Sequence, residues 1–535
     1  YATSNSTLIE GSNNGLYGIT KTEDQQTYGD VLLNIDKTFG ANWSLQANVG
    51  AVISDIRQDA FKNRGPIMES GIANLFNVFQ LDDTRVTREQ SGWREQYQSL
   101  FASAEIGYKG TYYLTLTGRN DWPSQLAGSQ SVKASFFYPS VGASVVLSQL
   151  IPDMPENLSY VKVRGSWASV GMPFARFLAN PVYVWDADNK VWKTETNYPF
   201  YDLKPERTDS WEVGLTMRFL KHFDLDVSYY NTKTYNQTFD PQISVSSGYS
   251  TLYVQTGSVR NRGIELALGY GNKWGEFSWS SNFTLSSNQN RILELVDNYR
   301  HPETGQFITK DRLDVGGLNQ AHFILKKGGS LGDLYSIIDL KRDANGHIYV
   351  DENDRIYTVS ENLDDIKLGS VFPKANMAWR NDFRWKNLSF GFMVSARIGG
   401  IVYSATQAQL DYYGVSEDSA AARDAGGVAV NGGSLLPAYN WYEVVGGKNI
   451  PQYYTYSATN VRLQEASIGY TIPKEKLGGV CEITLSLVGR NLWMIYCKAP
   501  FDPEAVATTG NYYQGIDYFM MPSLRNIGFN MRLKF

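Results

Sequence analysis

The chain has 535 residues, of which 14% are aromatic and 19% are charged, and it contains 48 glycines. This composition is typical of strands and tight turns, and the net charge of −5 offers no basic surface, which excludes nucleic acid as a partner. No run of about 18 apolar residues occurs, so transmembrane helices are excluded as well.

From the N-terminus onward, apolar and polar residues alternate with period two in segments of about ten residues, the length that a tilted strand needs to cross a bilayer. Tyr112, Leu114 and Leu116, for example, alternate with threonines and Tyr113. Between these segments we expect short turns at residues 40–42, 109–110, around Leu220 and at 271–275, a moderate connection at 148–157, and long loops at 54–96, 124–134, 171–208 and 234–259.

The alternation continues to the C-terminus, where the apolar set is Ile527, Phe529, Met531, Leu533 and Phe535. Here we expect short turns at residues 384–387 and 473–480, and long loops at 288–375, 399–460 and 494–524. Long and short connections therefore alternate along the chain. This is typical of outer-membrane barrels, whose periplasmic turns are short and whose extracellular loops are long.

These observations predict an all-β fold, a transmembrane antiparallel β-barrel wall of about fifteen strands, or sixteen if residues 15–20 form one. A soluble sandwich could alternate in the same way, but it has no reason to place every long loop at one end. The count suits a complete porin as well as part of a larger barrel. We expect the lipid-facing side chains to be exposed on the wall, among them Phe223, Leu225, Val227, Phe529, Met531 and Leu533.

From about Tyr97 to Phe535 the chain resembles the SusC/RagA-like family of TonB-dependent transporters. Single motifs are weak, but their shared order over this length makes coincidence improbable. Trp122 departs from the family pattern. The motifs are residues 113–122 (YLTLTGRNDW), 137–147 (FYPSVGASVVL), 161–171 (VKVRGSWASVG), 203–215 (LKPERTDSWEVGL), 229–232 (YYNT), 257–266 (GSVRNRGIEL), 368–373 (LGSVFP), 489–493 (GRNLW), 501–504 (FDPE) and 522–535 (PSLRNIGFNMRLKF).

The resemblance implies that residues 1–535 are the C-terminal portion of a barrel of roughly 22 strands in the bacterial outer membrane. It implies that the plug, an N-terminal domain and about six early strands are not in this chain. The strand that ends at Phe535 would then pair with the missing N-terminal barrel segment, because an open sheet edge is not tolerated in lipid.

As to function, the resemblance implies active import of a glycan or an oligopeptide, driven by TonB through the missing plug. It also implies a SusD-like surface lipoprotein as a lid, and dimers of such transporter and lid pairs. We expect the lid on the long loops at residues 54–96, 171–209, 288–374 and 399–460. The alternatives are a passive porin-type or structural barrel and a secreted carbohydrate-binding or hydrolytic all-β protein.

Aromatic residues of the long loops are the candidate contacts for cargo or lid, although they could equally pack the loops together or belong to the interfacial aromatic girdle. They are Trp185, Trp192, Tyr198, Tyr201, Tyr412, Tyr413, Trp441, Tyr442, Tyr453 and Tyr454.

Catalytic and metal sites are not expected. The four histidines, His222, His301, His322 and His347, lack both a nucleophile motif and metal-ligand spacing, so the chain is not expected to be an enzyme. Cys481 and Cys497 lack the CxxC spacing of a zinc site, and we expect both to be unpaired. Residues 343–354 (DANGHIYVDEND) resemble a calcium loop, but His347 replaces an oxygen ligand, which favours a solvated hairpin turned by Asn345 and Gly346 over calcium.

Overall fold

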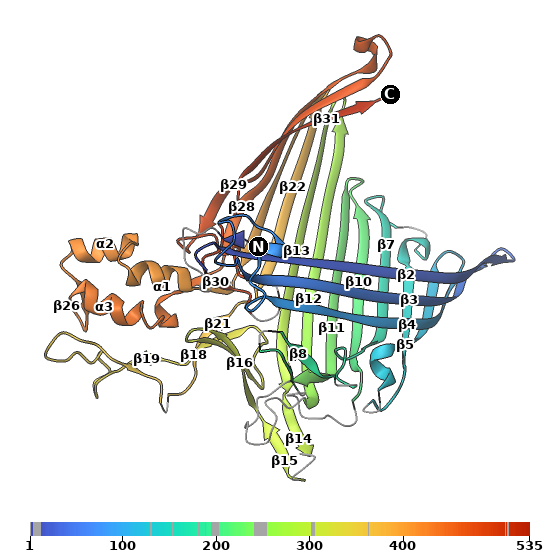
Figure 1. The fold of residues 1–535 in the computed structure, drawn as a ribbon. Helices are drawn as coiled ribbons and strands as arrows, with labels where there is room; N and C mark the ends of the chain where they lie inside the picture. The colour runs from blue at the N-terminus through green and yellow to red at the C-terminus, as the bar shows by residue number, and fades with distance from the viewer. Residues whose placement is uncertain are drawn as a thin grey trace. The chain divides into compact units, whose positions relative to one another are not determined.

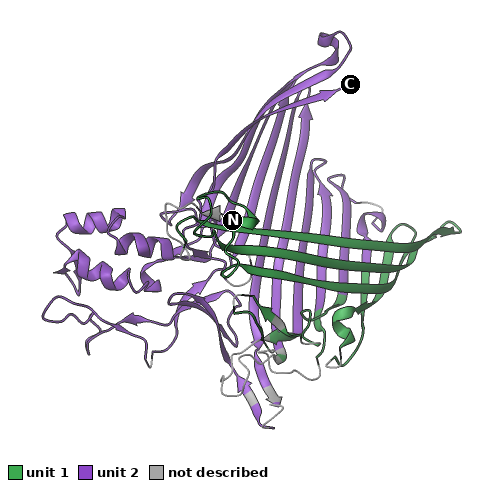
Figure 2. Ribbon diagram, in the orientation of Figure 1, with its two compact units in different colours: residues 1–142, 168–208, 236–255 green, residues 143–167, 209–235, 256–535 purple. Residues whose placement is uncertain are grey.

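In the computed structural model the chain forms two compact units, which Figure 2 distinguishes by colour. Unit 1 comprises residues 1–142, 168–208 and 236–255, and unit 2 comprises residues 143–167, 209–235 and 256–535. The structure describes residues 2–3, 12–128, 131–151, 154–179, 182–187, 189–193, 203–239, 254–300, 305–361, 363–508, 510 and 513–535.

Most of the secondary structure belongs to one sheet of 16 strands, one of which is the two-residue β1 (Ala2–Thr3) (Figure 1). Apart from the smaller strands of the connections, each strand pairs with the next along the chain. The long strands are β2 (Leu16–Phe39), β3 (Trp43–Pro66), β4 (Thr87–Tyr108), β5 (Tyr112–Pro123), β6 (Phe136–Val146), β7 (Leu158–Met172), β10 (Glu206–Phe219), β11 (Phe223–Phe239), β12 (Val254–Trp274), β13 (Phe277–Glu294), β22 (Ala375–Trp385), β23 (Leu388–Ile398), β28 (Asn460–Ile472), β29 (Glu482–Cys497) and β31 (Asn526–Lys534).

The short turns confirm the sequence prediction. Gly40 closes the β2–β3 hairpin, Lys109 and Gly110 close β4–β5, and Leu220 and Lys221 close β10–β11, all with positive φ. The turns at residues 386–387 and 473–481 are also short, whereas the β12–β13 turn is shorter than expected, because β12 extends to Trp274. The connections between these turns are long, so the alternation of short and long connections is confirmed.

The prediction of a loop at residues 54–96 is wrong, because β3 extends to Pro66 and β4 begins at Thr87. The paired register continues from Ser54↔Tyr97 to Arg64↔Thr87. Apolar residues stop alternating with polar ones near Ile53, and beyond that point both faces of the ribbon carry polar side chains. Backbone hydrogen bonds between antiparallel strands do not need an apolar face, so the ribbon continues past the end of the apolar pattern. Residues 15–20 form no separate strand, because residues 16–20 are the first part of β2.

The two faces of the unit 2 sheet differ as predicted. Residues paired across neighbouring strands point to the same face of the sheet. One such row is apolar and crosses five strands through Leu268, Phe283, Trp379, Val394 and Leu463. Near the short turns this apolar face carries stacked aromatic rings, such as Trp279 and Phe383 with centroids 6.0 Å apart.

The six side chains expected to be exposed on the apolar face divide into two groups. Phe529, Met531 and Leu533 are exposed, but β31 is exposed on both faces, because among the described residues it has only β29 as a neighbour. Phe223, Leu225 and Val227 are half-buried. The pairing of β31 with a strand outside residues 1–535 stays a prediction.

Three long connections of unit 2 share one hydrophobic core, and we call residues 295–374, 399–459 and 498–525 the loop platform. Buried side chains from all three meet in it, including Phe323, Tyr403, Trp441, Tyr454 and Ile516. Its elements are β14 (Val296–Arg300), β15 (Phe307–Lys310), β16 (Arg312–Leu318), β17 (Ala321–Lys326), β18 (Asp333–Ser336), β19 (Asp339–Leu340), β20 (Thr358–Val359), β21 (Ile366–Ser370), β24 (Ile401–Ser404), α1 (Ala405–Tyr412), α2 (Glu417–Asp424), β25 (Val428–Val430), β26 (Ser434–Leu436), α3 (Ala438–Val445), β27 (Thr455–Ser457) and β30 (Ile516–Asp517).

Local caps and pairings hold the loop platform in place. Ser404 and Ser416 cap the N-termini of α1 and α2 by accepting hydrogen bonds from backbone N–H groups inside each helix. β24 pairs with β27 and, in parallel, with β30, which joins the second and third connections. No helix among the described residues is long and apolar enough to cross a membrane. Both cysteines are unpaired, as predicted.

Candidate functional site

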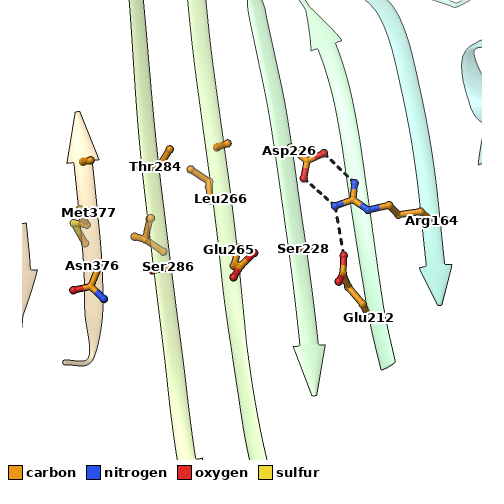
Figure 3. Close-up of a pocket in the computed structure, with 13 residues that line it drawn as sticks. Arg164, Glu212, Asp226, Ser228, Glu265, Leu266, Thr284, Ser286, Asn376 and Met377 are labelled. Carbon is orange, nitrogen blue, oxygen red and sulfur yellow. Dashed lines mark hydrogen bonds and ion pairs between the residues drawn. The ribbon is translucent and has the colours of Figure 1, made fainter. Parts of the chain in front are cut away.

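Arg164 of β7 lies at the centre of a charged cluster on the polar face of unit 2 (Figure 3). Its guanidinium donates a hydrogen bond of 2.9 Å to each carboxylate oxygen of Asp226 and one of 3.0 Å to Thr216 Oγ1. Glu212 Oε1 lies 3.6 Å from Arg164 Nη2. A Cβ at Gly214 would lie 2.5 Å from Arg164 Cζ, so glycine is needed for the guanidinium to pass over β10. The cluster carries a net negative charge, because two carboxylates, those of Asp226 and Glu212, face one guanidinium.

The polar face continues across β12, β13 and β22. The register places Glu265 opposite Ser286 and Ser286 opposite Asn376, and all three line one hollow with Arg164 and Asp226 (Figure 3). Carboxylate, hydroxyl and amide groups on one wall can accept and donate hydrogen bonds to the polar groups of a sugar or a peptide.

A second charged cluster lies on the same face of β22, β28 and β29. Arg380 Nε donates to Asp382 Oδ2 at 2.9 Å, and its Nη1 lies 3.7 Å from Glu465 Oε1. Arg490 Nε in turn donates to Glu465 Oε2 at 3.2 Å. The two arginine side chains are 48% and 68% exposed, whereas the Glu465 side chain between them is 22% exposed, and the cluster presents alternating charges rather than one sign.

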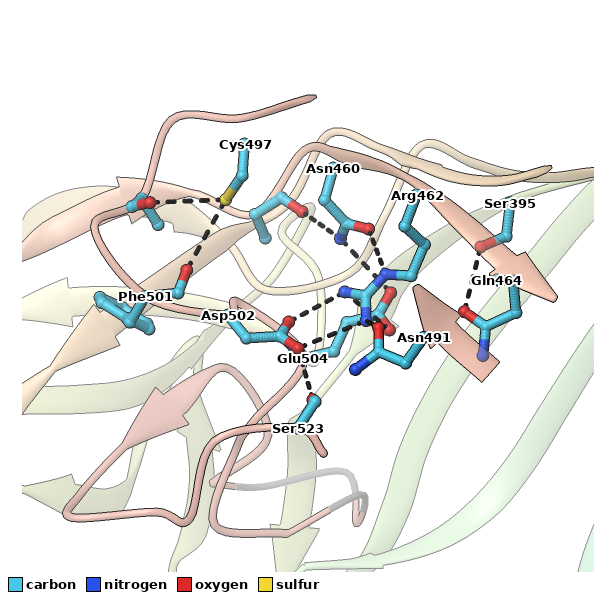
Figure 4. A network of polar contacts seen from close by, with 12 residues as sticks. Ser395, Asn460, Arg462, Gln464, Asn491, Cys497, Phe501, Asp502, Glu504 and Ser523 are labelled. Carbon is cyan, nitrogen blue, oxygen red and sulfur yellow. Dashed lines mark hydrogen bonds and ion pairs between the residues drawn. The ribbon is translucent and has the colours of Figure 1, made fainter. Parts of the chain in front are cut away.

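Arg462 of β28 joins the sheet to the loop platform (Figure 4). Its Nη2 lies 2.9 Å from Asp502 Oδ1 and 3.2 Å from Glu504 Oε2, and its Nη1 donates to Asn491 Oδ1. Ser523 donates a further hydrogen bond to Asp502. Burial alone would raise the pKa of Asp502, but hydrogen bonds from Arg462 and Ser523 outweigh it, so the pKa lies below its ordinary value.

Irregular strand pairing directs Arg462 toward these partners. The β28–β29 register shifts between Val461 and Arg462 and again between Leu463 and Glu465. Asn491 has a positive φ of 51°, which asparagine tolerates better than most residues. Bulges of this kind bend a strand and re-aim its side chains.

Eight of the ten predicted aromatic contacts lie within the described residues, and they fall into three groups. Trp185 and Trp192 face each other across the small hairpin of β8 (Val184–Asp186) and β9 (Val191–Lys193), with ring centroids 5.3 Å apart, and both are exposed. Tyr412 and Tyr413 are exposed at the end of α1. Tyr198 and Tyr201 lie outside the described residues.

The remaining four aromatic residues, like Tyr412 and Tyr413, belong to the loop platform. Trp441 and Tyr454 are buried in its core, whereas Tyr442 and Tyr453 lie at its edge. The rings of Trp441 and Tyr453 meet edge to face at 5.3 Å. Burial raises the pKa of Tyr454 above its ordinary range and that of Tyr442 to about 12. The role of all these aromatic residues in contacting cargo or lid stays a prediction.

Residues 343–354 form two successive turns with the same hydrogen bonds. The Asp343 carboxylate accepts from the backbone N–H groups of Asn345 and His347, at 2.8 and 2.9 Å. Asp351 accepts from those of Asn353 and Arg355, both at 2.9 Å. Such hydrogen bonds, from backbone N–H groups to an aspartate side chain, are typical of aspartate turns. An aspartate turn is the structural alternative to a calcium loop at this segment. The preference for a solvated hairpin over a calcium site at this segment stays a prediction.

The histidines are dispersed. His222 Nδ1 lies 3.1 Å from the Gly271 carbonyl oxygen, and His322 Nδ1 lies 2.9 Å from Asp314 Oδ2. His301 lies outside the described residues. Within the described part of the chain, no group of three or more His, Cys, Asp and Glu side chains is placed to hold a metal ion.

Sequence reasoning missed all three arginine-containing clusters, around Arg164, Arg380 and Arg462. Arg164 and Arg462 lie in or near segments that the alternating pattern predicts to be strands. That pattern does not indicate which carboxylates these arginines pair with. The motif at residues 501–504 (FDPE) was the available signal, because two carboxylates next to a proline in a long loop need a cation if they are buried.

Comparison with known proteins gives concordant results. The family model described as TonB dependent receptor-like, beta-barrel matches residues 1–492. TonB-dependent receptor P3 of Formosa agariphila is 24% identical over 95% of this chain and 52% of its own length. TonB-dependent receptor P26 of the same organism is 26% identical over 93% of the chain and 52% of its own length. The chain thus spans about half the length of the curated relatives it matches.

The fold matches that of a solved transporter. The RagAB peptide transporter superimposes with a TM-score of 0.74 at 16% identity, over 97% of this chain and 56% of that one. The same importer in its open-open state gives a TM-score of 0.72. At this identity the likeness shows the fold alone.

Proposed function

Because the chain belongs to the TonB-dependent receptor-like β-barrel family, a family of outer-membrane transporters and not of enzymes, we propose that it forms the wall and external platform of an active importer. The short turns then lie in the periplasm and the loop platform lies outside the cell. In this proposal TonB acts through a plug supplied by a further segment of the receptor. The polar face of the sheet is the lumen wall along which cargo moves.

The loop platform is the observation that carries this proposal. A passive pore needs only loops long enough to close strand pairs, whereas here three connections build a common core with three helices. Ordering this much chain costs conformational entropy, which burial of the common core offsets, and binding residues lie disproportionately on ordered loops of this kind.

We propose that the loop platform receives a surface lipoprotein lid of the SusD type. Tyr413, Val415 and Tyr439 are 71%, 69% and 73% exposed on this platform. A group of large apolar side chains this exposed is typical of a surface that a partner covers. Tyr412 and Leu435 are exposed beside them in the chain. A lid over such a surface would bury these side chains at the centre of its interface. Pairs of transporter and lid would then form dimers.

Glycan and oligopeptide both remain candidate cargoes. The charged and amide groups around Arg164 and Glu265 suit either class, and the peptide named for the RagAB transporter belongs to that protein. Of the two alternatives for Trp185 and Trp192, cargo or lid, we propose that these residues of the β8–β9 hairpin contact cargo.

The experiment uses the full-length receptor in its own outer membrane. Uptake of fluorescent oligopeptides and of fluorescent oligosaccharides is measured with and without a protonophore, and proteins that co-purify in mild detergent are identified. We expect one cargo class to enter only while the proton gradient stands, and a lipoprotein to co-purify. Uptake that persists without the gradient would instead support the passive porin-type barrel.

The matched variants separate lid from cargo. Tyr413→Ser with Tyr439→Ser should release the lipoprotein, whereas Trp185→Ser, on a connection of the other unit, should leave it bound. A lipoprotein that stays bound to the double variant would contradict this assignment of the lid surface.

A further inference from the structure

Unit 1 carries a hollow of about 990 Å³ on one face of β2 to β5. Its floor comprises Gly29, Val31, Ala51, Ile53 and Leu100, and its upper edge comprises Gln98, Trp122, Ser124, Ala127 and Ala134. The strand register aligns Gly29, Ile53, Gln98 and Trp122 in one row and Val31, Ala51 and Leu100 in the next. Because Gly29 has no side chain, a space remains beside Ile53 in the first row, and this space is part of the hollow.

The hollow lies on the apolar face of the sheet, away from the lumen. The opposite face at the same height is polar, and we take it to be the lumen side. There Arg119 Nε donates to Asp121 Oδ1 at 2.7 Å, and Arg119 Nη2 donates to Ser99 Oγ. In an outer-membrane barrel the apolar face meets lipid. Val31 and Leu100 of the floor are 76% and 56% exposed, so the hollow is continuous with the lipid-facing surface.

Aromatic side chains place the hollow at the outer border of the membrane. On the same face, the rings of Trp43 and Tyr108 lie with their centroids 4.6 Å apart in a tilted arrangement beside the periplasmic turn, where barrels carry one aromatic girdle. Ile53 lies ten residues beyond Trp43 on β3. At about 3.3 Å per residue and a tilt of about 40°, this spans roughly 25 Å, the height of the apolar band. Trp122 then marks the outer border.

The rim above the hollow is polar. On the same face, one row outward, the Asp55 carboxylate accepts hydrogen bonds from Arg94 Nε at 3.0 Å, Arg94 Nη2 at 2.8 Å and Gln96 Nε2 at 3.2 Å. The side chain of Arg94 remains 68% exposed. The backbone N–H of Gln96 donates to Ser124 Oγ, and this hydrogen bond joins the upper edge of the hollow at Ser124 to β4. An apolar floor below a hydrogen-bonding rim matches an amphiphile with one acyl chain and a polar head.

We propose that this hollow is a lipid site, which retains one outer-leaflet lipid with an acyl chain in the floor and its polar head against Gln96, Arg94 and Asp55. Ordinary lipid contacts are spread evenly over a barrel wall. Here the hollow recesses the surface beneath Trp122, Ser124 and Ala127, and the rim supplies directed donors. The site is independent of import and of the lid.

The test uses the full-length receptor, purified in mild detergent and reconstituted in vesicles of phosphatidylethanolamine that contain a phospholipid with a photoreactive acyl chain. Gly29→Leu fills the floor, and a Cβ there meets Ile53 at an ordinary 3.6 Å, so the strand should tolerate it. Ala51→Phe is the second filling variant. Val49→Phe adds apolar volume to the same face outside the hollow and is the matched control.

We expect crosslinks in the wild type to concentrate on the peptides that contain Ile53, Leu100 and Trp122, and to fall at least fivefold in both filling variants but not in the control. Gel mobility before and after heating checks that each barrel is folded. Crosslinks spread evenly over the lipid face, or unchanged in the folded filling variants, would overturn the proposal. It would equally fail if the only retained acyl chain belonged to a co-purified lipoprotein.

Discussion

Arg462 and Asp502 are 40 residues apart in the sequence, yet they form a two-point ion pair, with Nη2 to Oδ1 at 2.9 Å and Nη1 to Oδ2 at 3.3 Å. Their side chains are 4% and 11% exposed. The pair fastens the last external connection to the top of β28, and through β30 it reaches the core of the loop platform. Arg462 is therefore a buried anchor between the sheet and the third connection of the platform.

Arg462→Met should free this connection. It leaves the Asp502 carboxylate buried without its cation, and breaking a buried pair costs about 3–5 kcal/mol. Proteolysis of residues 498–525 in the intact receptor should become faster. Arg490→Met is the control, since the Arg490 side chain is 68% exposed beside Glu465 and such pairs contribute about 0–1 kcal/mol. Equal protease resistance of the two variants would show that Arg462 does not anchor the connection.

Trp441→Ala should loosen the loop platform without affecting the sheet. Trp441 is 8% exposed in the shared core, and removing a buried large aromatic side chain costs about 3–5 kcal/mol. Surface proteolysis of residues 399–459 on intact cells should increase, while the heat-dependent gel mobility of the barrel stays unchanged. Tyr518→Ala, at a position of the platform that is 50% exposed and outside the proposed lid surface, should alter neither measurement. Loss of the folded barrel in Trp441→Ala would mean that platform and sheet fold as one unit.

Acid should weaken the β16–β17 hairpin through Asp365. Hydrogen bonds from Arg312 at 2.6 Å, and then the contact with Lys326 at 2.9 Å, lower the pKa of Asp365 to about 2. Because the folded pKa is depressed, the stabilisation is complete above the ordinary pKa of 3.8 and is lost as the pH falls toward 2.

Hydrogen exchange of residues 312–326, after correction for the intrinsic rate, is the measurement for this pH effect. Protection should decrease between pH 5 and pH 2.5 in the wild type and should be low at both values in Asp365→Asn. A wild-type hairpin that keeps its protection at the lower pH would argue against the pairing.

Arginine at Val227 and at Ser228 should have unequal effects on the stability of the barrel. Val227 belongs to the apolar alternation of β11, and a charged side chain on the lipid face near the midplane costs about 2–4 kcal/mol. Ser228 lines the polar hollow with Asp226 and Glu265, where an added guanidinium finds carboxylates. Unfolding of the reconstituted receptor in urea measures both costs. Equal losses of stability would refute the assignment of the two faces.

The sequence by itself determined the strand faces, the short turns and the alternation of short with long connections. These features are local, because period two assigns each side chain to a face, and glycine or another residue at positive φ marks a turn such as Lys109–Gly110. Family motifs spread along the chain then identified the type of barrel, although no single motif was specific.

Only the tertiary structure decided how the long connections are organised. That β3 and β4 continue as a ribbon beyond Ile53 depends on backbone hydrogen bonds, which the side-chain pattern does not record. That Tyr454 and Trp441 are buried, while Tyr413 is exposed, depends on packing between connections that are far apart in the sequence. Arg462 and Asp502 meet for the same reason. Contacts of this kind arise from the closure of long loops against one another, and period-two alternation within a single strand carries no information about them.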